Sequence, residues 1–268
     1  MIVDSHQHIG SLSDALAYDG TDSLSETSVE SDARRRLGAM DAHGIDRAVL
    51  QPSHGYLRTD GLAATMRIND RMVEYMSLAP ERFWALGTTE PMHGTAGVGE
   101  VDRIASLGLK GVAWHHRFQG CYIDSRWMWP TLDRMATLEL VPLVHVNVES
   151  SMESHWRLQR LARDFPGLTF LAMDGLWSYE RARHALFSAS VTSNVIWDMG
   201  GPVCYVSAAE WVERNGSTNL CFSADLHYGA QEAEREVPLL KHIEASGLPE
   251  ADKANILGGN LARLFGFT

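Results

Sequence analysis

Short apolar runs recur along the chain, and amphipathic segments separate them. Runs of this kind, rich in β-branched and aromatic side chains, are typical of buried parallel strands. We expect strands over residues 2–6, 47–51, 83–88, 109–114, 141–146, 169–173, 194–198 and 220–223. The segments between them carry the periodicity or the end signals of helices. We expect these helices over residues 28–40, 61–78, 99–107, 129–138, 151–164, 179–187, 203–214 and 231–245.

Strands that alternate with helices predict a parallel α/β fold, and eight of them favour a closed (β/α)8 TIM barrel over an open doubly wound sheet. No Pro/Gly/Ser-rich linker divides the chain, so we expect a single domain over residues 1–268. Barrel enzymes place their chemistry at the carboxyl ends of the strands. Polar side chains follow the apolar runs in chain order: His6 and His8; Gln51 and His54; Glu90 and His93; His115, His116 and Arg117; His145 and Asn147; Asp174; Asp198; Asp225 and His227.

Composition narrows the class of partner. The formal net charge is −11, with 34 acidic and 23 basic residues, which disfavours nucleic acid and anionic membranes as partners. No apolar run is long enough to span a membrane, and the chain does not open on a signal-like segment, so we expect a cytoplasmic protein. Cys121, Cys204 and Cys221 show no CxxC spacing, which argues against disulfides and against a thiolate zinc site.

The first strand runs into a His-x-His pair. Alternation along a strand sends His6 and His8 to the same side, where two imidazoles can bind one cation. By itself this motif is weak, because two solvated or core histidines give the same pattern. A metal site therefore requires further ligands at the ends of other strands.

Several motifs, taken in order, resemble the amidohydrolase superfamily. They are VDSHQH over residues 3–8, APERF over 79–83, LGLKGV over 107–112, FPGLTF over 165–170, FSAD over 222–225 and ILGGNLARLF over 256–265. The likeness is to the amidohydrolase-related branch, which includes aminocarboxymuconate semialdehyde decarboxylase, resorcylate-type decarboxylases and several lactone hydrolases. It spans nearly the whole chain.

The resemblance implies that His6, His8, His145 and Asp225 hold one divalent cation. Three imidazole nitrogens and one carboxylate suit Zn²⁺, with Mn²⁺ or Fe²⁺ as alternatives. A site without metal is a further alternative, because some lactone hydrolases of this group are understood to work without one. From the residues alone, His145 could instead be a core histidine, and Asp225 could cap a following turn or helix.

One position departs from the family pattern. The family usually has a histidine at the end of the sixth strand, where this chain has Asp174. A carboxylate there adds negative charge near the cation and removes an N–H donor. Asp174 could therefore act as a general base, orient a ligand or bind the metal, and the alternative is a turn residue before Gly175.

The end of the fourth strand is the candidate substrate clamp. Arg117 can bind a carboxylate bidentately, and His115 or His116 can add a hydrogen bond, although an exposed polar loop gives the same pattern. Trp177 and His54 are expected to wall the site, and Asn147 is a further candidate for substrate binding. Four histidines in helical segments are expected at the surface: His43, His155, His184 and His242.

These features predict a metal-dependent hydrolase, in which metal-activated water attacks a lactone, ester or amide carbonyl and Asp225 or Asp174 shuttles the proton. The substrate is expected to be small and carboxylated or cyclic. The alternative is a metal-dependent, non-oxidative decarboxylase of an aromatic or unsaturated carboxylic acid. A non-catalytic barrel that binds a metabolite would lack metal ligands. Assembly into a homodimer is left open.

Overall fold

A computed structural model describes residues 1–11, 28–52, 60–200, 204–228 and 237–266. The strands are β1 (Val3–Ser11), β2 (Arg47–Gln51), β3 (Phe83–Ala85), β4 (Gly111–Trp114), β5 (Val141–His145), β6 (Phe170–Met173), β7 (Val195–Asp198), β8 (Leu220–Cys221) and β9 (Leu226–Tyr228). The helices are α2 (Val29–His43), α3 (Leu62–Leu78), the short 3-10 helix η1 (Pro91–His93), α4 (Thr95–Ser106), α5 (Met128–Thr137), α6 (His155–Asp164), α7 (Tyr179–Val191), α8 (Ala208–Asn215), α9 (Pro238–Glu244), α10 (Glu250–Ala254), the π-helical turn η2 (Asn255–Gly259) and α11 (Asn260–Phe265).

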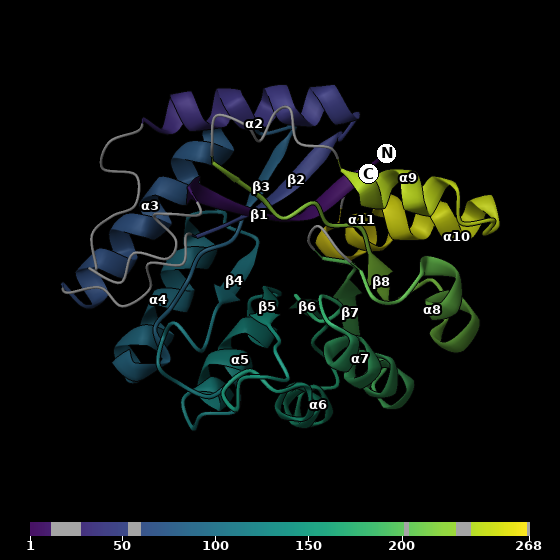
Figure 1. The fold of residues 1–268 in the computed structure, drawn as a ribbon. Coiled ribbons are helices and arrows are strands. Elements are labelled where there is room, and N and C mark those ends of the chain that lie inside the picture. Colours follow the sequence, from purple (N-terminus) through teal and green to yellow (C-terminus); the bar gives the residue numbers. More distant parts are fainter. Residues whose placement is uncertain (12–27, 53–59, 201–203, 229–236, 267–268) are drawn as a thin grey trace.

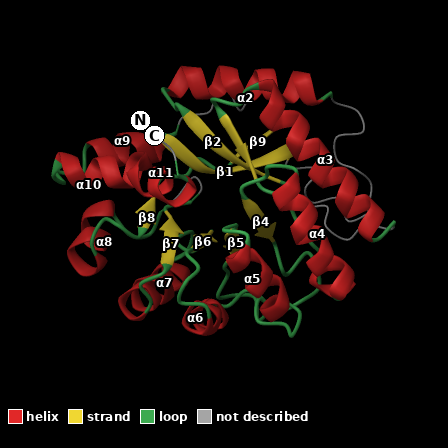
Figure 2. Cartoon of the chain, turned by 180° about the vertical axis from the view of Figure 1, so that it is seen from behind, coloured by secondary structure: helices red, strands yellow, loops and turns green. Residues whose placement is uncertain are grey.

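The strands form two parallel arcs that close into a barrel. One arc has the order β3-β2-β1-β9, and the other has the order β4-β5-β6-β7-β8. Gly87 bridges Val112 at one seam, and the Ser5 amide donates to the Phe222 carbonyl at 3.2 Å at the other. The helices surround the strands (Figure 1), and the reverse view shows the same ring (Figure 2). The expected (β/α)8 fold is confirmed.

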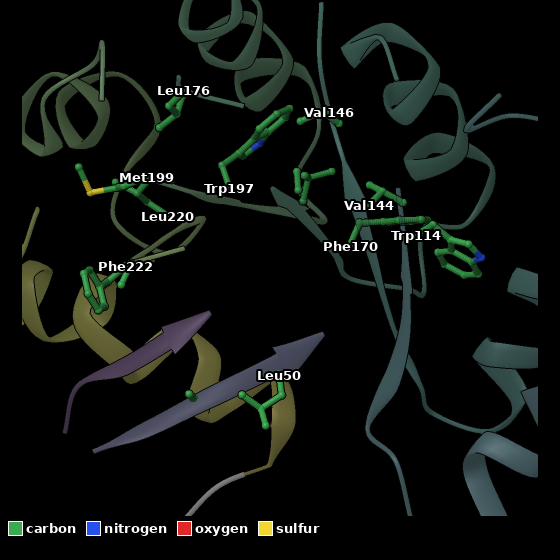
Figure 3. Packing of buried hydrophobic residues seen from close by; sticks show 14 of the residues in the cluster. Leu50, Trp114, Val144, Val146, Phe170, Leu176, Trp197, Met199, Leu220 and Phe222 are labelled. Atoms are coloured by element: carbon green, nitrogen blue, oxygen red, sulfur yellow. The ribbon is translucent and has the colours of Figure 1, made fainter. Parts of the chain in front are cut away.

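Alternate strand residues face two apolar layers. Val49 and Leu143 belong to a cluster inside the barrel, whereas Leu50 and Val144 belong to the larger cluster between the barrel and its helices. Figure 3 shows part of this outer layer, with Trp114, Val144, Phe170, Trp197 and Phe222. Complete burial on both faces of the sheet explains why the strands read as continuous apolar runs.

A bulge in β1 decides where its histidines point. Val3 packs inside the barrel and Ile9 packs in the outer layer, so strict alternation from Val3 would turn His6 and His8 outward. The pairing of β1 with β2 shifts register between residues 4 and 7. The extra residue of such a bulge re-aims the side chains that follow it. His6 and His8 therefore point into the barrel.

Most predicted elements exist, but several ends differ. The helix expected over 99–107 begins four residues earlier, at Thr95. The helix expected over 151–164 begins at His155, because turns occupy the preceding loop: the Glu153 amide donates to the Ser150 carbonyl at 3.2 Å. The helix expected over 203–214 begins at Ala208. Of the helix expected over 231–245, residues 231–236 lie outside the described residues, and α9 begins at Pro238. The C-terminal helices α10 and α11 and strand β9 were not predicted.

Among the described residues, no helix is both long enough and apolar enough to cross a bilayer.

Candidate metal centre

Three imidazoles from β1 and β5 meet inside the barrel. The first strand was expected to end at His6, but β1 continues to Ser11, so His6 and His8 lie within it, whereas His145 ends β5. The Nε2 atoms of His6 and His8 lie 2.9 Å apart, and the Nε2 atom of His145 lies 3.3 Å from each of them. All three side chains are about 1% exposed. Nitrogen ligands about 2.0–2.1 Å from a tetrahedral cation are separated by about 3.3 Å, so this spacing suits one shared metal ion.

Each ring is fixed by its other nitrogen. His8 Nδ1 donates to the Pro52 carbonyl at 2.9 Å, and His145 Nδ1 donates to the Trp114 carbonyl at 2.8 Å. His6 Nδ1 lies 3.3 Å from Asp198 Oδ2. Because an oxygen acceptor requires the proton on Nδ1, the neutral form of each ring keeps a lone pair on Nε2 directed at the common point. This is the donor arrangement that a divalent cation requires.

Asp225 is the carboxylate candidate beside these imidazoles. Its Oδ1 lies 3.4 Å from His6 Nε2, and the residue is 6% exposed. The backbone there has a φ of 50°, a left-handed conformation that is uncommon outside glycine. The preceding residue, Ala224, donates its amide to Asp4 Oδ1 at 2.8 Å, which ties this turn to β1. Three imidazoles and one carboxylate fit Zn²⁺ or Mn²⁺.

The site concentrates negative charge. Burial acts to lower the pKa of His6, but Asp225, Asp198 and Asp174 outweigh it and raise the pKa to about 10. Asp198 is fully buried at the end of β7, and burial raises the pKa of its carboxyl group. Several carboxylates around one cluster of imidazoles stabilise a cation by simple electrostatics.

Asp174 lies beside this cluster. Its Oδ1 is 3.9 Å from His6 Nδ1, and no described residue gives that oxygen a hydrogen bond. Burial raises the pKa of Asp174 to about 7; the charge on His6 opposes this shift, whereas Asp225 and Asp198 add to it. The backbone at Asp174 has a φ of 65°. Strained non-glycine residues of this kind often occur at functional sites.

The strand-four residues approach the cluster from the side. The His115 ring stacks on His145, with centroids 4.1 Å apart and planes within 5°. Ligand atoms of His115, His145 and Asp174 all lie within 4.8 Å of one another. Arg117 Nη2 lies 3.4 Å from His115 Nε2, so the candidate clamp reaches the edge of the imidazole cluster.

The remaining residues that were expected to bind substrate differ in burial and in hydrogen bonding. Asn147 Oδ1 accepts the Glu149 amide at 2.9 Å, so this side chain is engaged within its own loop. His116 is fully buried with neither ring nitrogen hydrogen-bonded to a described residue, and burial lowers its pKa to about 3. Trp177 borders the site: a Cβ on Gly200 would lie 2.7 Å from Trp177 Nε1 and 3.1 Å from Asp198 Oδ2. His54 lies outside the described residues.

Two buried acids at the site were not among the predicted site residues. Asp198 ends the seventh apolar run, and the strand-end rule placed it at the site end of the barrel without assigning it a role. Glu153 lies in the loop before α6, is fully buried, and has Oε1 2.6 Å from His115 Nδ1. Burial raises the pKa of Glu153 to about 8, while the amide and the charge of Arg117 act to lower it. Nothing in the sequence pattern distinguishes Glu153 from a surface acid.

His155 was expected at the surface because it lies in a helical segment, and this expectation is wrong. The residue is 1% exposed, and its ring stacks on Trp197 with centroids 5.5 Å apart. The reason is its position at the first turn of α6, which turns it toward the barrel.

Several solved structures share the fold across the whole chain. One is 4-oxalomesaconate hydratase from Rhodopseudomonas palustris, at 16% identity and a TM-score of 0.73, covering 100% of this chain and 96% of that chain. Another is 5-carboxyvanillate decarboxylase from Novosphingobium aromaticivorans with manganese and 4-hydroxy-3-methoxy-5-nitrobenzoic acid, at 18% identity and a TM-score of 0.71, covering 99% and 96%. A third is dihydroxybenzoic acid decarboxylase from a Polaromonas species with manganese and 2-nitroresorcinol, at 16% identity and a TM-score of 0.70, covering 99% and 96%.

The comparison with curated proteins gives no match. A family model described as Amidohydrolase matches residues 3–267, which is nearly the whole chain and includes every candidate metal ligand. The resemblance noted in the sequence is thereby confirmed, and the chain belongs to the amidohydrolase family.

Proposed function

We propose that the protein is a metal-dependent, non-oxidative decarboxylase of a small aromatic or unsaturated carboxylic acid. The observation that carries this proposal is the surroundings of the imidazole cluster. A buried carboxyl group, Asp174, lies on one side of it, and the guanidinium of Arg117 lies one ring away. A substrate carboxylate and a proton donor can therefore meet at the same point.

The sequence favoured hydrolysis and gave decarboxylation as the alternative, whereas we now place decarboxylation first. Two of the three related structures are decarboxylases of aromatic acids, and each holds manganese with a nitro-substituted aromatic ligand. The third is a hydratase, not a hydrolase. At below 20% identity these enzymes support a choice of reaction class without identifying the substrate of this chain.

The cation belongs between His6, His8, His145 and Asp225, where it would supply Lewis acidity toward oxygen atoms of the substrate. We expected Zn²⁺, and the manganese in two relatives makes Mn²⁺ the main alternative. Asp198 orients the His6 ring through Nδ1, as carboxylates beside metal-binding histidines commonly do.

The chain's own residues account for the remaining steps. Arg117 orients the substrate carboxylate through its planar N–H groups. The bond between that carboxyl group and its carbon breaks, CO2 leaves, and the electron pair stays on the carbon. Asp174 in its acid form gives its proton to this carbon and recovers a proton from solvent water. The near-complete burial of the three imidazoles and of Asp174 limits competing water.

Hydrolysis is the second candidate, and the same Asp174 favours it. A buried carboxyl group with a pKa near neutrality is present in both forms, so its carboxylate can accept a proton from water that attacks a carbonyl carbon. Asp225 would then act only as a metal ligand and would not transfer a proton.

One assay separates the two candidates. Protein loaded with Mn²⁺ or Zn²⁺ is incubated in D2O with a panel of hydroxybenzoic acids and, separately, with a panel of lactones, esters and amides. The proposal predicts CO2 release and a single deuterium on the carbon that lost the carboxyl group. Hydrolysis of a lactone, ester or amide without CO2 release from any acid would replace it by the second candidate. His145→Ala, which removes one ligand, serves as the control for contaminating activity.

A further inference from the structure

The carboxylate of Glu153 is buried beneath the strand-four clamp. The side chain is fully buried, and its own backbone is fixed, because the Asn147 amide donates to the Glu153 carbonyl at 2.7 Å. A buried carboxylate is costly unless several donors satisfy it. Its donors therefore indicate which part of the molecule it serves.

All of these donors belong to the clamp. Glu153 Oε1 lies 2.6 Å from His115 Nδ1 and accepts the Arg117 amide at 3.0 Å. Glu153 Oε2 lies 3.5 Å from Arg117 Nε. One carboxylate thus holds the imidazole, the backbone and the guanidinium of the two residues that were expected to contact substrate.

His115 passes this constraint to Arg117. When His115 donates its Nδ1–H to Glu153 in a hydrogen bond, its Nε2 keeps a lone pair. Arg117 Nη2 lies 3.4 Å from this Nε2 and can donate to it. The guanidinium therefore forms an ion pair with Glu153 at Nε, without a hydrogen bond to Oε2, and contacts His115 at Nη2. Its side chain remains 34% exposed, and within the described part of the chain no hydrogen bond occupies Nη1. A guanidinium fixed on two sides with a free edge is ready to bind an anion.

We infer that Glu153 is a positioning residue, which holds Arg117 and His115 in the geometry that binds a carboxylate of the substrate. This inference rests on the proposed function, because it assigns the clamp to the acid group of that substrate. It adds a residue that makes no contact with the substrate and still determines the preference for charged over neutral ligands.

Glu153→Gln tests the inference, because it keeps the shape and replaces one acceptor oxygen by an NH2 donor. The amide can no longer accept at both ends, so its NH2 group faces a donor of His115 or Arg117. The probes are 4-hydroxy-3-methoxy-5-nitrobenzoate and the corresponding carboxamide, which differ only in the charged group. Quenching of tryptophan fluorescence measures their binding to the Mn²⁺-loaded protein.

We expect Glu153→Gln to weaken binding of the carboxylate about tenfold or more, as for the loss of hydrogen bonds to charged groups. Binding of the carboxamide should change less than about twofold. Glu149→Gln is the matched control, since this acid lies in the same loop but has a 58% exposed side chain paired with Arg181. Equal weakening of both probes would mean that Glu153 only maintains the shape of the site, and would overturn the inference.

A double-mutant cycle tests whether Glu153 acts through Arg117. Arg117→Gln should abolish the preference for the carboxylate, and adding Glu153→Gln should then cause no further loss. Additive losses overturn the inference, as does a wild-type protein that does not prefer the carboxylate.

If Glu153→Gln does not fold, Arg117→Lys decides the question. It keeps the charge but lacks the planar fork that Glu153 and His115 hold, so the preference should fall about tenfold. An unchanged preference in Arg117→Lys overturns the inference. If the wild-type protein prefers the carboxylate over the carboxamide but releases CO2 from none of the acids, the result counts against the proposed reaction and still supports the clamp.

Discussion

The two ends of the barrel are built in opposite ways. At the amino ends of the strands, α11 closes the barrel with apolar side chains, and Phe265 stacks on Trp84 with centroids 6.4 Å apart. Charged groups at this end sit at the surface in ordinary pairs, such as Lys253 and Glu250 at 3.0 Å. At the carboxyl ends, acids and imidazoles are buried, and Asp174 Oδ1 lacks a hydrogen bond from any described residue.

Three described residues other than glycine have positive φ angles: two lie at the carboxyl ends of the strands, whereas Glu139, with a φ of 54°, precedes β5 at the amino end. Asp174 and Asp225 both have positive φ angles, and both end or follow strands at the carboxyl end. Left-handed non-glycine residues and unsatisfied buried acids reduce stability by about 1–3 kcal/mol each. The difference teaches that one end of the barrel stabilises the fold, while the other retains unfavourable features that suit chemistry.

The largest effect should come from removing a candidate metal ligand. His6→Ala or Asp225→Asn should abolish measurable turnover and lower the bound metal, which mass spectrometry of the purified protein quantifies. The thermal midpoint should fall only by the stabilisation that the metal itself provides. Full metal loading with unchanged activity in either variant would remove that residue from the site and weaken the contrast between the two ends.

The opposite end should show the reverse pattern. Leu261 is fully buried in the cluster inside the barrel, so Leu261→Ala should reduce the free energy of unfolding by about 2–5 kcal/mol. Its kcat, measured well below the new melting temperature, should stay close to that of the wild type. A variant of normal stability and low kcat would show that the two ends are coupled.

Asp174→Asn probes the proton-transfer role at the carboxyl end. It preserves shape and removes the titratable proton, so kcat should fall by about a hundredfold, which is typical of a general acid or base. Metal content should be unchanged. Asp174→His restores the usual residue of the family and should keep part of the activity if the position only orients water. Wild-type kinetics in Asp174→Asn would make Asp174 a turn residue.

The smallest effect concerns a buried histidine that is not a candidate metal ligand. Burial lowers the pKa of His155 from about 6.5 to about 3, and His184 and Arg181 act in the same direction. The unfolded chain therefore binds a proton between these pH values that the folded chain does not. Stability should be full above about pH 6.5 and should fall toward pH 3, by up to about 1.4 kcal/mol per pH unit.

His155→Leu should reduce the dependence of the unfolding free energy on pH by this amount, as measured by urea denaturation between about pH 6 and about pH 4. His184→Leu, on the exposed neighbouring ring, is the control: it removes a smaller contribution than burial, so most of the dependence should remain. Equal pH dependence in wild type and His155→Leu would mean that His155 can be protonated in the folded protein.

The sequence by itself determined the barrel and the end of it that carries the chemistry. Eight apolar runs separated by helical segments dictate parallel strands, because each strand must be buried on both faces. Polar residues after those runs then had to meet at one end. The motifs added the set of His6, His8, His145 and Asp225; the structure groups the three histidines and places Asp225 Oδ1 3.4 Å from His6 Nε2.

Only the tertiary structure decided how these side chains are aimed. The bulge in β1 turns His6 and His8 into the barrel, and it depends on pairing with a distant strand. Glu153 reaches His115 from a loop 38 positions further along the chain, and His155 is buried by packing on Trp197. Periodicity reports which face of an element is apolar. It does not report which loop residue a neighbouring strand end will bury, because that depends on contacts between elements distant in the chain.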